Sequence, residues 1–143
     1  MPMTSFHSFF PRLAEVETRT VTLPRRCLSL PPDTYAFVDL YCDEPGCDCE
    51  NVLLNVYDGA RRHVATINHA LGPSGAFGDA EDPGTFLDPL NQQSPLAFDL
   101  LALFKEVVRS ADYDARLRRH RAMVREKVEG RSEHKRSGVR GGR

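Results

Sequence analysis

Residues 51–69 constrain the fold most, because they have the pattern of two antiparallel strands joined by a tight turn. Residues 51–57 and 61–69 contain typical strand residues, and Asp58-Gly59 between them is a strong turn signal. A four-residue turn that begins at Asp58 would place Val52 opposite Ile67. One face of the hairpin is then apolar, as a half-buried sheet requires. The residues of that face are Val52, Leu54, Val56, Ala65 and Ile67.

Two more segments extend this hairpin into a sheet. Tyr35–Tyr41 is a strand bounded by turn residues, and Arg19–Leu30 is rich in β-forming residues. Together with Asn51–Tyr57 and Arg62–Ala70 they predict a small antiparallel sheet of about four strands. The first 18 residues show no clear period, so we expect an irregular lead-in there. Its aromatic residues, which we expect to tuck onto the body, are Phe6, Phe9 and Phe10.

Two helices are predicted near the C-terminus. The first begins at Ser94, a helix-capping residue, with Pro95 at its first position. The second begins at Asp112 and ends at Gly130, a typical C-terminal helix residue. Their apolar sides, which need a sheet to pack against, are Leu96, Leu100, Leu103, Phe104 and Val107 in the first helix and Tyr113, Leu117, Val124 and Val128 in the second.

The whole pattern predicts an α+β fold in one domain. Residues 19–129 form the domain, residues 1–18 the lead-in, and residues 130–143 a disordered basic tail without an apolar pattern. A chain of 143 residues with 41% hydrophobic and 27% charged residues suits one soluble domain with a modest core. No apolar run approaches the roughly 18 residues of a membrane span, and we expect a cytoplasmic protein.

The near-neutral net charge of −1 conceals a split along the chain. Residues 116–143 carry 11 basic and 3 acidic side chains, whereas residues 1–115 carry 8 basic and 17 acidic ones. A basic segment after an acidic body can bind nucleic acid or an acidic partner, or lie against its own acidic body as a solvated helix face. The arginines that would contact nucleic acid are Arg118, Arg119, Arg121 and Arg125.

Three of the four cysteines lie within eight residues, in the segment Tyr41-Cys42-Asp43-Glu44-Pro45-Gly46-Cys47-Asp48-Cys49. The Pro-Gly turn lets the backbone reverse, so that Cys42, Cys47 and Cys49 can direct their sulfur atoms at one cation. In a reducing compartment such a cluster is more often a metal site than a set of structural disulfides. Thiolates favour soft metals, and we predict zinc. A thiol-redox role, an incidental disulfide or buried free thiols are the alternatives.

The fourth ligand is open at this stage. In the expected hairpin His69 lies opposite Glu50, close to Cys49, but its side chain reaches the metal only through a bulge or strand end. Cys27 is the other candidate, although strand spacing places it roughly 13 Å from Cys42. Asp43, Asp48, water or another chain could also complete the set. Four protein ligands would make a structural site, and three with a water would make an open one.

The long segment between the sheet and the helices, residues 71–90, is rich in glycine, proline and acidic residues. A loop of this length is uncommon without a function or disorder. Its acids lack the spacing of a calcium loop. The remaining histidines are scattered along the sequence, and we expect them to be ordinary surface residues: His7, His63, His120 and His134.

The cysteine segment, followed later by Phe86-Leu87-Asp88-Pro89-Leu90-Asn91-Gln92-Gln93-Ser94-Pro95, resembles an uncharacterised bacterial family. Members of that family look like small α/β domains, and some carry a cysteine-rich SEC-C zinc motif at the C-terminus. The similarity covers roughly residues 35–128. Here a Gly/Arg/Ser tail replaces the SEC-C motif. The resemblance implies metal binding and a fold, and no reaction.

The leading functional hypothesis is a non-enzymatic, zinc-stabilised binding or adaptor module, because the cysteines come without an assembled base, nucleophile and oxyanion site. A rival is a metal-dependent hydrolase, in which the three cysteines leave one zinc position for water and Glu44 or Asp48 acts as base. The third hypothesis is nucleic-acid binding by the basic C-terminal helix. The partner, protein or nucleic acid, is unknown at this stage.

Overall fold

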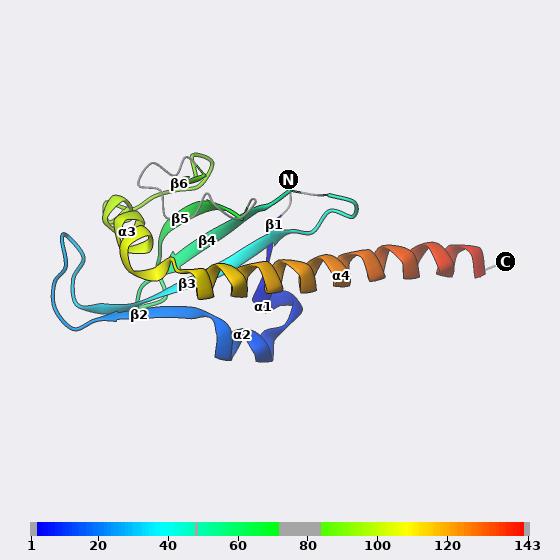
Figure 1. Cartoon of the computed structure of the whole chain (residues 1–143), viewed down its shortest axis with the longest axis horizontal. Helices are drawn as coiled ribbons and strands as arrows, with labels where there is room; N and C mark the ends of the chain where they lie inside the picture. The colour runs from blue at the N-terminus through cyan, green and yellow to red at the C-terminus, as the bar shows by residue number, and fades with distance from the viewer. Residues whose placement is uncertain (1–2, 48, 72–83, 142–143) are drawn as a thin grey trace.

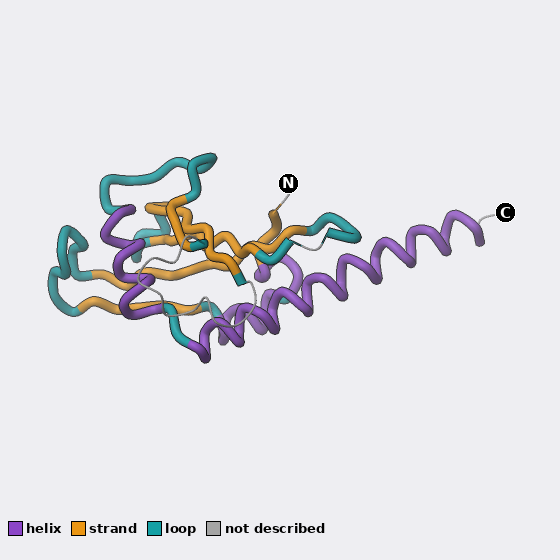
Figure 2. The backbone as a smooth tube through the Cα atoms, turned by 45° about the horizontal axis from the view of Figure 1, so that its top comes forward, coloured by secondary structure: helices purple, strands orange, loops and turns teal. Residues whose placement is uncertain are grey.

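The computed structural model describes residues 3–47, 49–71 and 84–141, with side chains as far as residue 131. It confirms an α+β fold built on an antiparallel sheet, with α-helices packed against the sheet (Figures 1 and 2). The elements in chain order are β1 (Met3–Ser5), α1 (Phe6–Phe9), α2 (Pro11–Glu17), β2 (Arg19–Leu23), β3 (Asp33–Cys42), β4 (Asn51–Tyr57), β5 (His63–Ala70), β6 (Thr85–Leu87), α3 (Ala97–Leu103), the π-helical turn η1 (Phe104–Val108) and α4 (Ala111–Gly141). Of the helices in these ranges, none has both the length and the apolar character needed to cross a membrane.

The sheet has six strands in the described part of the chain, two more than expected from the sequence. Its order is β1-β3-β4-β5-β6, and β2 also pairs with β3. The strands β2 and β1 share one edge of β3, since β2 pairs with its first half and β1 with its last three residues. The two additional strands have only three residues each, too short to leave a period in the sequence. Their pairing depends on residues far along the chain.

The central hairpin has the expected strands and the expected apolar face, but a different register. Val52 pairs with His69, two residues further along β5 than predicted. The predicted register was wrong for two reasons. Tyr57 pairs with His63 and not with Arg62, which displaces the register by one residue, and the ladder shifts by a second residue between Val56 and Tyr57. Side chains alternate with a period of two, so a displacement of two residues preserves both faces. The predicted apolar residues Val52, Leu54, Val56, Ala65 and Ile67 are all buried.

The turn that joins β4 and β5 explains this shift. The Arg61 amide donates to the Asp58 carbonyl at 2.9 Å, so a four-residue turn begins at Asp58 as expected. The left-handed backbone conformation then falls on Arg61, with φ of 65°, and not on Gly59. A turn followed by one left-handed residue produces a bulged hairpin, in which one strand gains a residue relative to the other.

Both C-terminal helices depart from the expected pattern. The first begins at Ala97, so the predicted start at Ser94 was wrong: the Ser94 hydroxyl accepts a hydrogen bond from the Leu96 amide in the turn before the helix. The second begins at Ala111, where the Ser110 hydroxyl, and not the predicted Asp112, accepts the hydrogen bond from the Tyr113 amide.

The first C-terminal helix ends in the π-helical turn η1, which places Val108 in the core and leaves Val107 52% exposed, although Val107 was expected on the apolar side. A π-turn inserts one residue into the helical repeat and so rotates the following side chains. The second helix, α4, continues past Gly130 to Gly141. Gly130 lacks the positive φ of a C-terminal helix cap, so the predicted end there was wrong.

The N-terminal segment is more regular than expected. Residues 3–17 form β1, α1 and α2 instead of an irregular lead-in. Pro11 begins α2 with the φ that a first helical turn needs, and the Ser5 hydroxyl accepts a hydrogen bond from the Ser8 amide to cap α1. Phe6 is fully buried, and Phe9 and Phe10 pack against the core, as predicted for the three aromatic residues.

A buried histidine attaches α4 to the centre of the sheet. His120, predicted to be a surface residue, is 1% exposed. Its Nδ1 lies 2.7 Å from the Asp39 carboxylate on β3, and its Nε2 lies 2.7 Å from Glu17 at the end of α2. Each ring nitrogen thus lies within hydrogen-bond distance of a carboxylate on a different element. The Phe6 ring stacks on this imidazole with centroids 3.7 Å apart.

Further hydrogen bonds extend this cluster. The Tyr41 hydroxyl donates to Asp39 at 2.7 Å, which gives that buried carboxylate a second partner. Burial and the nearby Asp39 carboxylate raise the Tyr41 pKa, so the phenol keeps its proton. Arg119 donates to both oxygens of Glu17 at 3.0 Å. The cluster therefore joins α2, β3 and α4 through paired charges.

We expect Arg61→Gly to stabilise the protein. A non-glycine residue in the left-handed region costs about 1–2 kcal/mol, and the greater chain entropy of glycine in the unfolded state offsets part of this gain. The net gain should be about 0.5–1 kcal/mol in the free energy of unfolding, measured by urea denaturation. The neighbouring Ala60→Gly, at an ordinary φ, is the matched control and should destabilise. Equal losses for both variants would contradict the assigned turn.

Glu17→Gln should destabilise the protein in a pH-dependent manner. The hydrogen bond from His120 holds the Glu17 pKa below its ordinary value of 4.5, and Arg119 adds to this effect. A lowered folded-state pKa gives stability that is present above the unfolded-state value and is lost as the pH falls through the folded-state value. The variant should lose roughly 1–2 kcal/mol at pH 7, and the two proteins should converge below pH 4.5.

Urea denaturation at neutral and acidic pH measures this difference. Glu15→Gln, on the exposed side of the same helix α2, is the matched control and should behave like the unmodified protein at every pH. A loss of unfolding free energy in Glu17→Gln that is the same at every pH would contradict this prediction. It would show that the charge of Glu17 does not contribute to stability through the contact with His120.

Candidate metal centre

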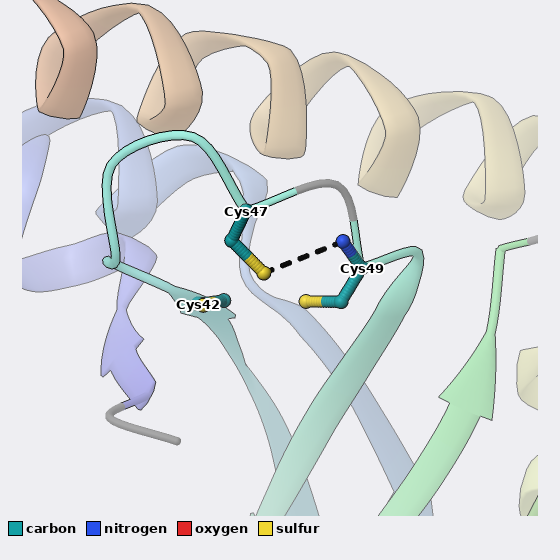
Figure 3. A group of neighbouring side chains, drawn as sticks. All are labelled: Cys42, Cys47 and Cys49. Atoms are coloured by element: carbon teal, nitrogen blue, oxygen red, sulfur yellow. Dashed lines mark hydrogen bonds between the residues drawn. The ribbon is translucent and has the colours of Figure 1, made fainter.

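The three clustered cysteines lie on the connection between β3 and β4 (Figure 3). Cys42 is the last residue of β3, where it pairs with Met3 of β1. The chain then reverses through Gly46, which has a φ of +77°, and the Cys47 amide donates to the Glu44 carbonyl at 3.2 Å. Glycine adopts this left-handed conformation without steric cost, so the predicted Pro-Gly turn is present.

This turn brings three thiol groups together. The sulfur atoms of Cys42, Cys47 and Cys49 lie within 4.8 Å of one another, and all three residues are half-buried. The Cys49 amide donates to the Cys47 sulfur at 3.4 Å, a hydrogen bond that stabilises a thiolate. A tetrahedral zinc ion with Zn–S bonds of about 2.3 Å holds its sulfur ligands roughly 3.8 Å apart. The cluster thus matches a thiolate metal site with only a small contraction.

Helix α4 holds this turn from one side. The guanidinium group of Arg121 donates twice to the Cys49 carbonyl, at 3.0 and 2.7 Å. Two helical turns further on, the Glu129 carboxylate accepts a hydrogen bond from the Gly46 amide at 2.8 Å. Arg125 lies between them on the same helical face. The backbone on both sides of Cys47 is therefore fixed to one helix.

Strand β1 holds the other side of the turn. The Thr4 hydroxyl donates to the Asp43 carboxylate at 2.5 Å. Asp43 follows Cys42 directly, so this contact fixes the point at which the chain leaves the sheet. Asp43 was one of the candidates for the fourth ligand. In the structure its carboxylate belongs to the contact with β1.

The three thiols differ in acidity. Hydrogen bonds from the Cys49 amide and the Cys42 thiol lower the Cys47 pKa below its ordinary value, and the positive charge of Arg125 contributes. Burial raises the pKa of Cys42 and raises that of Cys49 to about 11. Cys47 is therefore the thiol that ionises first and would be the first to bind a metal ion.

The two candidates for the fourth ligand lie away from the cluster. His69 is buried under the helices, where Nδ1 lies 2.8 Å from the Thr85 hydroxyl and Nε2 lies 3.0 Å from Asp114 of α4. Both ring nitrogens thus have protein partners. Its side chain points to the core because it pairs with Val52 on the apolar face of the hairpin. Cys27 is an exposed free cysteine in a bridge with Leu30. Among the described residues, the group of candidate ligands consists of the three cysteines.

The four arginines of the nucleic-acid hypothesis differ in their contacts. Arg119 pairs with Glu17, and Arg121 binds the Cys49 carbonyl. Arg125 is half-buried near Cys47, and only Arg118 and Arg119 are largely exposed. Arg118, Arg121 and Arg125 follow one another at intervals of three and four residues, so they lie on one face of α4. Of the two bases in the hydrolase hypothesis, Glu44 is exposed, whereas Asp48 lies outside the described residues, as does most of the long acidic loop (residues 72–83).

The residues that support the turn were not predicted from the sequence. Arg121, Arg125 and Glu129 are spaced four residues apart, which places them on one helical face. That spacing is visible in the sequence, but it does not show what the face contacts. The support from Thr4 depends on a pairing across 39 residues and left no local signal.

No protein-family model, no curated protein and no solved structure matches this chain.

Cys47 should react fastest of the clustered thiols in protein treated with a chelator. Its pKa is lowered while the pKa values of Cys42 and Cys49 are raised, and the thiolate is the reactive form. At pH 7.5, iodoacetamide labelling followed by peptide mass spectrometry should show Cys47 modified first. Arg125→Gln should slow the labelling of Cys47 about two- to fivefold. Exposed Cys27 is the internal reference and should keep its rate; equal rates within the cluster would contradict this assignment.

Proposed function

We propose that this protein is a zinc-stabilised binding or adaptor module whose metal ligands are Cys42, Cys47 and Cys49. The observation that carries the proposal is the convergence of three sulfur atoms within 4.8 Å on one tight turn. Sulfur ligands select soft or borderline ions, and zinc is the common one that needs no redox chemistry. The resemblance of the cysteine segment to an uncharacterised bacterial family implies metal binding as well.

The charges around the turn support a site made of thiolates. Three thiolates around a divalent zinc ion leave one net negative charge. Arg125 lowers the Cys47 pKa, and Arg121 lies at the Cys49 carbonyl, so α4 provides positive charge beside the ligands. This arrangement favours the ionised thiols that a metal requires.

A structural role follows from the position of the site. The turn connects two adjacent strands of the sheet, and α4 binds it through Gly46 and Cys49. A metal ion that links Cys42 to Cys47 and Cys49 would connect the end of β3 to the start of β4. It would also hold the turn in the conformation that α4 contacts. The unfolded chain cannot preorganise these ligands, so the metal-binding energy stabilises the folded state.

Purified protein should contain about one zinc per chain. Elemental analysis of protein isolated without a metal-affinity column or chelator measures this ratio. Cys47→Ser should lower the zinc content and the melting temperature together, because it removes the most acidic ligand and leaves two thiols. The thermal loss should disappear when both proteins are compared after treatment with a chelator.

Cys27→Ser is the matched control, since Cys27 is exposed and lies apart from the cluster. This variant should keep both the zinc content and the melting temperature. Full zinc content and unchanged stability in Cys47→Ser would contradict a structural site at these cysteines. Loss of zinc in Cys27→Ser would instead show that Cys27 provides the fourth ligand.

A further inference from the structure

A groove of about 490 Å³ lies between the N-terminal helices and α4, away from the cysteine cluster. Phe10, at the junction of α1 and α2, forms one wall, and residues of α4 form the other. Figure 1 shows α4 passing beside these two short helices. The volume lies within the range of small-molecule sites. The residues that line the groove are Phe10, Met123, Glu126, Lys127, Gly130 and Arg131.

Gly130 is the residue without a side chain in the lining of this groove. It lies inside α4 with ordinary helical backbone, where glycine costs about 1 kcal/mol relative to alanine. A Cβ atom at this position would meet no other atom within 4 Å. Close packing therefore does not require glycine here. A larger side chain would extend into the open space of the groove.

The groove combines an apolar interior with positive charge. Phe10 and Met123 are partly buried against the core and provide apolar surface. The Lys127 ammonium lies 5.5 Å from the centre of the Phe10 ring, and the Arg131 guanidinium lies 4.9 Å from that of the Phe9 ring. Both cations are thus held beside the apolar surface by cation–π contacts. Among the described side chains that line the groove, Lys127 and Arg131 are cationic and Glu126 is anionic.

We propose that this groove binds a hydrophobic carboxylic acid, such as a medium-chain fatty acid. The aliphatic chain would lie on Phe10 and Met123, and flexible methionine adapts to chains of different shape. The carboxylate would pair with Lys127 and Arg131, which present charge-assisted hydrogen-bond donors. The two cations attract an anionic head group. The site is independent of the metal centre and of its proposed role.

Sodium decanoate, titrated into the ¹⁵N-labelled protein and followed by NMR, tests the proposal. Saturable changes in amide chemical shift should be confined to residues around the groove, with the largest changes at Gly130 and Arg131. Gly130→Leu should weaken decanoate binding at least tenfold, because the leucine side chain fills the space that the aliphatic chain of the ligand needs. This magnitude follows from the apolar contact area that the ligand would lose. Ala122→Leu adds the same side chain on the exposed face of α4 and should leave the affinity unchanged.

The head group is tested separately. Lys127→Gln with Arg131→Gln should weaken decanoate binding about three- to tenfold. Decyltrimethylammonium, with the same chain and the opposite charge, should bind more weakly than decanoate to the unmodified protein. Equal affinity for both amphiphiles, or unchanged decanoate binding in Gly130→Leu, would overturn the proposal. Chemical-shift changes that spread over the sheet and do not saturate would also overturn the proposal.

Discussion

The position of α4 depends on the buried contact between His120 and two carboxylates, Asp39 on β3 and Glu17 on α2. A buried charge is costly unless it is paired and hydrogen-bonded, and here each nitrogen of the imidazole has a partner. The contact is directional, unlike the apolar packing of Leu117, Val124 and Val128 around it. Apolar packing holds the helix on the sheet, and the histidine fixes its rotation and its position along its axis.

That rotation determines what the two flanks of α4 present. The residue after His120 is Arg121, and Arg125 and Glu129 follow at intervals of four, so this flank meets the cysteine turn. Met123, Lys127 and Gly130 lie on the opposite flank and form the groove against Phe10. A rotation of the helix by one residue would separate both surfaces from their partners. The candidate metal centre and the proposed acid site therefore depend on the same contact without touching each other.

The sequence was informative wherever a pattern was local. The bounds of β4, the apolar face of the hairpin and the buried stripe of α4 follow from periods of two and 3.6 residues. His120 lies on that stripe but was predicted to be exposed, because histidine is more often a surface residue than a core residue. Its spacing from Leu117 and Val124 was the signal that indicated burial.

The features that the sequence did not predict depend on an uncommon local backbone conformation or on partners far along the chain. The shift in the hairpin arises from a left-handed Arg61, a position where glycine is the usual signal. Strand β1 exists because the end of β3 provides an edge for it, and its three residues have no pattern of their own. The three cysteines were recognised as one group, but the position of His69 could not be predicted correctly. A register error of two residues placed it opposite Glu50 and not Val52.

The split of charge along the chain has a structural consequence within the molecule. Arg119 pairs with Glu17, Arg116 donates to the Glu17 carbonyl at 3.1 Å, and His120 pairs with Asp39. Each contact joins the basic segment after residue 115 to the acidic body before it. The opposite charges of the two segments thus attract α4 to the sheet and α2, and the short-range contacts then fix it. Within the described side chains, arginines of the basic helix thus hold it against the rest of the molecule.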